Sequence, residues 1–244
     1  MGRMTEAVKH ILIINVIMFF ATQLYGDQMY QWMSLWFLKN PNFEWWQVVT
    51  HMFMHGNLMH ILFNMYALWA FGTPLERIWG RNKFLFFYFS AGLGSAALHT
   101  GVNYFLFNEG ISALESAGIA PAQVLEILSN GQYSPGWYDI IGKSTVDSML
   151  TAFNTPAVGA SGAIYGILVA FAFMYSEAKL MLIFLPVPIK AKYFVPILIA
   201  VDLIFGIGNI NTGVAHFAHI GGALIGFIMM WYWKKDQFNN NRWN

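Results

Sequence analysis

The stretch Ala218-His-Ile-Gly-Gly-Ala-Leu-Ile-Gly226 decides the fold. In a helix, Gly222 and Gly226 lie on the same face as His219. A second stretch, Ser161-Gly-Ala-Ile-Tyr-Gly166, carries a matching pair of glycines four residues apart. Because small residues let two helices approach closely in lipid, we expect these two stretches to pack face to face. That packing would bring His219 beside Ser161 and Tyr165.

The composition is that of a membrane protein. Of the 244 residues 57% are apolar and 10% are charged, whereas soluble domains carry about 25% charged residues. An aromatic content of 18% excludes disorder for most of the chain. Lys and Arg number 13 against 12 Asp and Glu, so we expect no nucleic-acid partner. The chain has no cysteine, which excludes disulfides and Cys-ligated zinc.

Six apolar stretches predict an all-α membrane protein with six transmembrane helices. They run over residues 11–24, 57–71, 84–107, 161–175, 193–205 and 214–233. Several are shorter than the about 20 residues of a full crossing, so we expect helices that start below the membrane surface or a locally thinned bilayer. No small-residue cleavage site follows the first stretch, which we therefore interpret as a retained helix and not as a signal peptide.

The positions of Lys and Arg predict the topology. With six spans, 11 of the 13 fall on the side of the amino terminus, and Lys39 and Lys143 are the other two. Because cytoplasmic loops are enriched in Lys and Arg, we expect both termini to be cytoplasmic. Residues 1–234 are predicted to form a single transmembrane domain, and residues 235–244 a short polar cytoplasmic tail.

Two outer segments are too long to be simple connectors. The first, residues 25–50, is rich in Trp, which suits the headgroup layer. The second, residues 108–154, is predicted to be an extracytoplasmic insertion between the third and fourth spans. A helix should begin at Pro121 and end at Asn130-Gly131, and Ser144-Thr-Val-Asp147 resembles a capping box that opens another. We expect the insertion to be an accessory cap without chemistry.

Polar side chains within apolar spans are costly and therefore mark candidate sites. Ser161 stands between Gly159 and Gly162 at the start of the fourth span, where first-turn amides are free to hold an oxyanion. A plain N-cap serine among packing glycines is an equal alternative. A Ser–His pair can generate a nucleophile, with imidazole as the general base. His219 is the candidate base, and His216 is a rival nearer the surface.

His60 and Asn64 share one face of the second span. Both donate hydrogen bonds without adding a permanent charge, as an oxyanion hole in a low-dielectric site requires. The alternative is ordinary interhelical hydrogen bonding, worth about 0.6 kcal/mol in lipid. The convergence of both residues with Ser161 and His219 at a similar depth favours a site.

Asp202 is a further polar residue within an apolar span. At a rise of 1.5 Å per residue it lies roughly 6 Å from the outer end of the fifth span, and His219 roughly 8 Å below the outer start of the sixth. At this shared depth, Asp202 could orient an imidazole as a third member of the site. We favour the alternative, a carboxyl that is bonded to a neighbouring helix and takes no part in catalysis.

Three blocks of the sequence, in this order, resemble the signature blocks of the rhomboid intramembrane serine proteases. They are His55-Gly-Asn-Leu-Met-His-Ile-Leu-Phe-Asn64, Gly159-Ala-Ser-Gly162 and residues 218–226, and Glu76-Arg-Ile-Trp-Gly80 is similar to the inner loop of that family. The resemblance implies a rhomboid-like bundle and a catalytic dyad that needs no metal or cofactor. One departure is Trp46-Gln47, where the family usually has Trp-Arg, and it leaves open how the first loop is anchored.

The resemblance also implies a role for each matching residue. Ser161 would be the nucleophile and His219 the general base. The oxyanion hole would comprise His60, Asn64 and the Ser161 amide. Tyr165 would support the His219 ring, and the glycines of the blocks, Gly159, Gly162 and Gly222, would support the site.

The predicted function is cleavage of transmembrane segments of other membrane proteins near the extracytoplasmic face, in the bacterial cytoplasmic membrane. Residues 206–213 could act as a lid over the site. A catalytically inactive relative that binds transmembrane helices is the alternative. A metal-dependent protease is disfavoured because the chain has no His-Glu-x-x-His, and a transporter because we find no inverted repeat.

Overall fold

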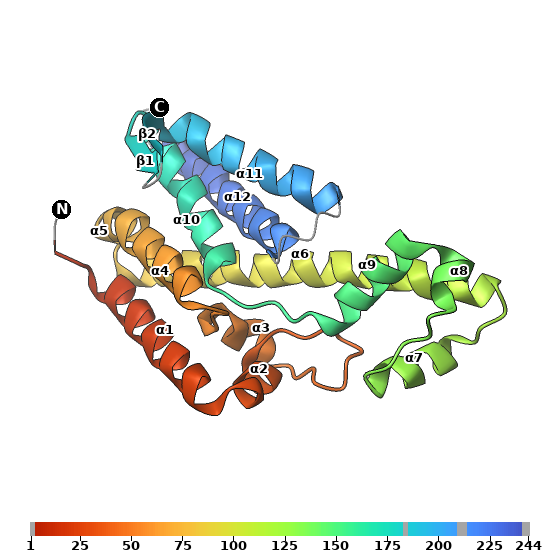
Figure 1. Ribbon diagram of the computed structural model, residues 1–244. Coiled ribbons are helices and arrows are strands. Elements are labelled where there is room, and N and C mark those ends of the chain that lie inside the picture. Colours follow the sequence, from red (N-terminus) through yellow and green to blue (C-terminus); the bar gives the residue numbers. More distant parts are fainter. Residues whose placement is uncertain (1–2, 183–184, 209–213, 241–244) are drawn as a thin grey trace.

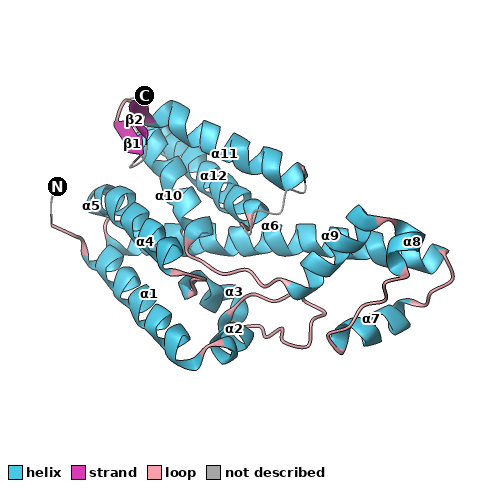
Figure 2. Ribbon diagram, in the orientation of Figure 1, coloured by secondary structure: helices cyan, strands magenta, loops and turns pink. Residues whose placement is uncertain are grey.

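The computed structural model describes residues 3–182, 185–208 and 214–240. Most of the described chain is helical, in agreement with the expected class (Figure 2). The long helical segments are α1 (Glu6–Tyr25), α4 (Leu58–Ala67) continued by α5 (Thr73–Trp79), α6 (Arg81–Ser116), α10 (Ser161–Met174), α11 (Ala191–Ile207) and α12 (His216–Asn240). The shorter helices are α2 (Asp27–Met33), α3 (Gln47–Thr50), α7 (Pro121–Ser129), α8 (Trp137–Ile141) and α9 (Lys143–Asn154).

The helices differ in how well each could cross a membrane alone. Among the described helices, α1 alone has both the length and the apolar composition of a crossing. Helix α10 is apolar but has 14 residues, and is roughly 21 Å long at 1.5 Å per residue. Helix α1 begins and α12 ends on the same side of the bundle (Figure 1). The number of crossings and the side on which the termini lie stay predictions.

The second, third and sixth expected spans continue well beyond their expected ends. Helix α4 continues through a π-helical turn, Leu68–Gly72, into α5. Pro74 lies in the first turn of α5 and has no N–H, so one backbone hydrogen bond of a regular helix cannot form there. The π-helical turn before it accommodates this loss. Helix α12 continues to Asn240, so that the described part of the expected tail is helical.

Helix α6 is the longest element and carries the insertion. Its 36 residues span roughly 54 Å, against about 30 Å for the hydrocarbon core of a bilayer. Residues 108–116, expected to belong to the insertion, are its last turns. The far half of α6 projects from the bundle, and α7, α8 and α9 surround it (Figure 1). The insertion is therefore built on a continuation of the helix that contains the third expected span.

The insertion packs around a hydrophobic core to which Phe37 of the residue 25–50 segment also contributes. Phe107 and Leu114 of α6 are fully buried against Val124 of α7, Trp137 of α8 and Met149 of α9. Since this cluster is separate from the core of the bundle, the insertion is a small packed unit and not a loose loop.

One expected helix start in the insertion is correct and the other is wrong. Helix α7 begins at Pro121 and is followed by Gly131 at a φ of 70°, as expected. The capping box at Ser144 is wrong, because α9 already begins at Lys143 after Gly142, whose φ is 78°. Asp147 instead accepts hydrogen bonds from Lys143 Nζ at 2.5 Å and Tyr138 Oη at 3.1 Å.

Gln47 anchors the first outer loop. Its side chain is fully buried. The amide nitrogen donates to the carbonyl oxygens of Gln31 at 2.9 Å and Asn42 at 2.7 Å, and the amide oxygen accepts from the Trp36 amide at 3.3 Å. One neutral side chain thus hydrogen-bonds to the backbone of this loop at three residues. Gln47 therefore anchors the loop at the position where the family usually has arginine.

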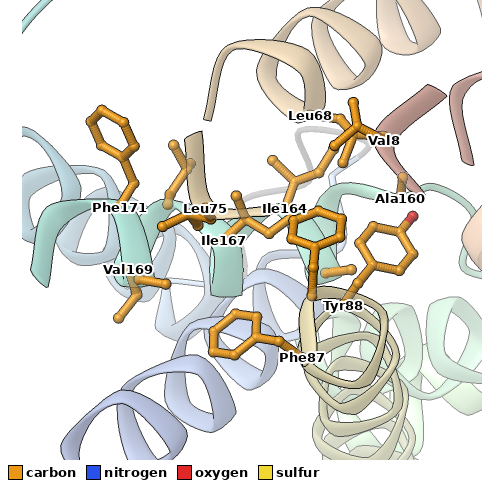
Figure 3. Packing of buried hydrophobic residues seen from close by; sticks show 14 of the residues in the cluster. Val8, Leu68, Leu75, Phe87, Tyr88, Ala160, Ile164, Ile167, Val169 and Phe171 are labelled. Atoms are coloured by element: carbon orange, nitrogen blue, oxygen red, sulfur yellow. The ribbon is translucent and has the colours of Figure 1, made fainter. Parts of the chain in front are cut away.

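The core of the bundle lies where α1, α4, α6 and α10 meet. Val8, Leu68, Tyr88 and Ile167 are fully buried, and Ile164 nearly so. Figure 3 shows these side chains converging from their separate helices. This core fixes α10 between the helices that carry the candidate polar residues.

Two antiparallel strands, β1 (Lys179–Leu182) and β2 (Leu185–Lys190), lie between α10 and α11. The sequence did not predict this hairpin. Glu177 lies beside it, 2.7 Å from Lys190 Nζ and 2.5 Å from Lys192 Nζ. Hydrogen bonds from these two ammonium groups lower the pKa of Glu177 to about 2. The hairpin is thereby tied to the start of α11.

Glu76 closes the amino terminus of α1. Its buried carboxylate accepts hydrogen bonds from the Ala7 and Val8 amides at 2.8 and 2.9 Å and from the Thr5 hydroxyl at 2.5 Å. These amides have no acceptor within their own helix, and a carboxylate also suits the positive end of the helix dipole.

Replacing Glu76 by Ala should therefore lower the free energy of unfolding by about 2 kcal/mol, because buried N–H groups lose a charged acceptor. Thermal unfolding in detergent measures the change. Glu115→Ala is the matched control, since Glu115 is exposed at the end of α6. Equal melting temperatures for the two variants would contradict this role of Glu76.

Candidate active site

The close approach of α10 and α12 predicted from the glycines is present. A Cβ atom on Gly222 would lie 1.8 Å from the Gly162 carbonyl oxygen, and one on Gly226 would lie 2.7 Å from the Gly166 Cα. A Cβ atom on Gly162 would lie 2.0 Å from the Ser95 hydroxyl of α6. Real Cβ atoms do not approach this closely, so only glycine fits at these positions without displacing a helix.

This packing brings His219 beside Ser161. The distance from His219 Nε2 to Ser161 Oγ is 2.8 Å. The ring of Tyr165 lies parallel to the imidazole of His219, with 4.1 Å between ring centroids and 14° between planes. An imidazole whose Nε2 lacks a proton can accept the hydroxyl proton at this distance, which is the first step in generating a serine nucleophile.

The segment before α10 presents Ser161 at the start of the helix. Ala157 and Leu35 exchange two backbone hydrogen bonds of 2.9 Å, and the Gly159 amide donates to the His51 carbonyl at 2.9 Å. Gly159 has a φ of 124°, and a Cβ atom there would lie 2.8 Å from His60 Nε2 and 3.6 Å from Ser161 Oγ. Because Gly159 has no side chain, the space between the His60 imidazole and the Ser161 hydroxyl stays open.

His60 and Asn64 offer donors at the same place. Asn57 caps α4 by accepting from the His60 amide at 2.9 Å. The Gly56 amide donates to His60 Nδ1 at 3.4 Å. Because Nδ1 accepts this hydrogen bond, the proton of a neutral His60 imidazole is on Nε2. Asn64 is buried, and among the described residues its Nδ2 has no hydrogen-bond partner. A buried donor without a partner is costly, and an oxygen bound in the cleft would satisfy it.

Asp202 accepts hydrogen bonds from two other helices. Its Oδ1 lies 2.6 Å from His216 Nδ1 and 3.1 Å from His219 Nδ1, and its Oδ2 accepts from the Tyr165 hydroxyl. The carboxyl is bonded to neighbouring helices, which agrees with the contact part of the favoured expectation. The contact with the candidate base, which we did not favour, is present as well.

These side chains border one cleft of about 1340 Å³. Its walls include residues of α4, α6, α10 and α12, with His60, Asn64, Ser161 and His219 among them. Asp147, Leu150 and Thr151 of α9 also line it, so that the insertion reaches the site. The sequence carried a signal for this, because α9 ends only a short segment before Ser161. Of the expected lid, residues 209–213 lie outside the described residues.

The histidines of the site do not gather around a metal position. Across residues 3–182, 185–208 and 214–240, no group of three or more His, Asp or Glu side chains is placed to hold an ion. His99 of α6 also lines the cleft. Its Nε2 lies 3.0 Å from Asn103 Nδ2, one turn along the same helix.

Comparison with known proteins gives one family. The family model for the rhomboid domain matches residues 42–140 and 137–235. The chain is 30% identical over 190 residues to rhomboid protease AarA of Providencia stuartii, covering 76% of this chain and 55% of that protein. It is 26% identical over 184 residues to rhomboid protease GluP of Bacillus subtilis (strain 168), covering 75% of this chain and 25% of that protein.

A mitochondrial protein is similar as well. Rhomboid protein 1 of Saccharomyces cerevisiae is 25% identical over 189 residues, which cover 77% of this chain and 42% of that protein. The matches therefore span about half or less of the length of each of these relatives.

Proposed function

Because the chain belongs to the rhomboid family of integral membrane proteins, we propose that it is an intramembrane serine endopeptidase with Ser161 and His219 as its catalytic pair. The observation that carries the proposal is the 2.8 Å distance between Ser161 Oγ and His219 Nε2 within the helical bundle. Asn64, whose Nδ2 has no hydrogen-bond partner among the described residues, lines the same cleft as this pair and supports the proposal.

In the proposed reaction, Ser161 Oγ attacks the carbonyl carbon of a peptide bond while His219 Nε2 takes the hydroxyl proton. The carbonyl oxygen becomes an oxyanion, which His60 Nε2, Asn64 Nδ2 and the Ser161 amide stabilise. His219 then gives the proton to the leaving amine and the acyl-enzyme remains. Water, deprotonated by His219, attacks the ester carbonyl carbon. The bond between that carbon and Ser161 Oγ then breaks, His219 returns the proton to Oγ, and the second product leaves with its new carboxyl group. No metal or cofactor takes part.

The proposed substrates are transmembrane segments of other membrane proteins, cut near the extracytoplasmic face. The cleft lies where α10 begins, at the opposite end of that helix from the hairpin (Figure 1). Since a helix hides its carbonyl groups, the substrate must unwind locally, and segments with Gly, Ala or Pro near the bond should be preferred.

For the topology we propose six crossings with both termini in the cytoplasm of a bacterium. Residues 1–234 would form one transmembrane domain, with residues 108–154 in or above the outer leaflet. The excess of Lys and Arg on the side of the termini supports this orientation.

The test uses the purified full chain in detergent with a reporter transmembrane substrate. We expect cleavage that EDTA does not affect. A fluorophosphonate, which reacts with activated serines, should block cleavage and add its mass to the peptide that contains Ser161. Cleavage lost in EDTA and restored by zinc would overturn the proposal in favour of a metal protease. Neither cleavage nor labelling, over several substrates, would support the alternative of an inactive protein that binds transmembrane helices.

A further inference from the structure

One carboxylate connects the proposed catalytic base to two further groups. Asp202 lies on α11, and its side chain is 6% exposed. Its Oδ1 faces His219 of α12 at 3.1 Å and His216 at 2.6 Å, and its Oδ2 faces the Tyr165 hydroxyl of α10. The nitrogen of His219 that faces Asp202 is Nδ1, and the nitrogen that faces Ser161 is Nε2.

This arrangement selects one form of the imidazole. A neutral imidazole carries one proton, and a carboxylate oxygen accepts but does not donate. With Asp202 ionised, the proton of His219 is therefore held on Nδ1. Nε2 is left with a lone pair that points at the Ser161 hydroxyl, as a general base requires.

The same carboxylate faces the charge that forms during the reaction. When His219 takes the Ser161 proton it becomes an imidazolium, 3.1 Å from Asp202 Oδ1. In a site of low dielectric an opposite charge at this distance stabilises the ion more than it would in water. Tyr165 contributes twice, because its ring stacks on His219 and its hydroxyl holds the second carboxylate oxygen.

We propose that Asp202 is a positioning residue for the reaction, which holds His219 in the Nδ1-protonated form and stabilises its imidazolium. The inference rests on the proposed function for its effect on rate. Its structural part, the protonation state of His219, does not depend on turnover. Asp202 acts through His219 and does not touch the substrate.

The kinetic test replaces Asp202 by Asn, which is nearly the same size. An amide that turns its oxygen to His219 provides no counter-charge, and one that turns its NH₂ group favours the wrong tautomer. We expect kcat to fall between roughly a hundredfold and ten-thousandfold with KM nearly unchanged. Asp202→Glu, which keeps the charge, should recover at least tenfold of that loss.

Leu203→Ala is the control on the same helix, because Leu203 is 43% exposed on the outside of the bundle, and its kcat should equal that of wild type. Thermal unfolding and size-exclusion profiles measure the folded fraction of every variant. An Asp202→Asn protein with kcat unchanged per folded molecule would overturn the proposal. So would an Asp202→Glu protein that is as impaired as Asp202→Asn while both are folded.

The second test reads the tautomer directly. Nitrogen-15 NMR of ring-labelled histidine, with the His219 signals identified by their loss in His219→Gln, should show Nδ1 protonated in wild type and altered in Asp202→Asn. A wild-type His219 protonated on Nε2 would overturn the proposal. A wild-type protein that neither cleaves nor reacts with fluorophosphonate but has the expected tautomer would instead refute the proposed function, and with it the effect of Asp202 on rate, while the hold of Asp202 on the protonation state of His219 would stand.

Discussion

Replacing Ser161 by Ala is expected to lower the rate of substrate cleavage by about a millionfold, to below detection, while the protein stays folded. The size of the effect follows from the loss of the nucleophile, since the members of such a catalytic unit act together and removing one costs about as much as removing all. Ser161 is the first residue of α10, and within the part of the chain that the structure describes its hydroxyl hydrogen-bonds to His219 Nε2 and to no other side chain. The substitution should therefore leave the melting temperature close to that of wild type.

The measurement is the initial rate of product formation, followed by gel and by mass spectrometry of the new termini. Ser116→Ala is the matched control, because Ser116 lies at the far end of α6 and its hydroxyl bonds only within its own helix. That variant should cleave at the wild-type rate. A Ser161→Ala protein that retains more than a thousandth of the wild-type rate would contradict the role of Ser161 as nucleophile.

Replacing Gly222 by Ala is the second change with a large expected effect. The new methyl group would lie 1.8 Å from the Gly162 carbonyl oxygen, which is backbone and has no rotamer to escape into. Helices α10 and α12 must move apart, and we expect the free energy of unfolding to fall by about 3 kcal/mol. A displacement of about 1 Å between Ser161 and His219 should also lower kcat roughly a hundredfold.

Gly101→Ala provides a control of opposite sign. A Cβ atom on Gly101 of α6 meets nothing within 4 Å, and Ala is favoured over Gly within a helix by about 1 kcal/mol. This variant should melt at or above the wild-type temperature. If Gly222→Ala also melts like wild type and cleaves at the same rate, the close contact of α10 with α12 does not set the geometry of the site.

The sequence was sufficient to predict the approach of α10 and α12. Spacing along a helix determines which residues share a face, and two glycine faces are complementary whatever surrounds them. This packing also predicted that His219 lies close to Ser161 and Tyr165, because these residues lie on or beside the two glycine faces. His60 and Asn64 were harder to place, since their helix meets α10 through larger side chains.

The end of α6 could not be predicted for a physical reason. The polarity of residues 108–116 marks where the chain leaves the hydrocarbon, and a helix does not have to end there. Its continuation depends on tertiary packing, because Ile111 and Leu114 are buried against the insertion. The sequence placed Asp202 at the depth of His219, but it could not show which side chains Asp202 contacts, because that depends on how α11 packs against α10 and α12.

Because Asp202 stands on α11, the proposed role of its carboxylate makes the reaction rate depend on the position of that helix. The carboxylate leaves α11 and touches side chains of α10 and α12, so a sliding or tilting of α11 by about 1 Å changes the alignment of the base without any change at Ser161. We expect the thickness of the surrounding lipid to influence the tilt of that helix. If Asp202 positions His219 as proposed, turnover should consequently change with the thickness and composition of the bilayer, which would make the membrane a regulator of the reaction as well as its solvent.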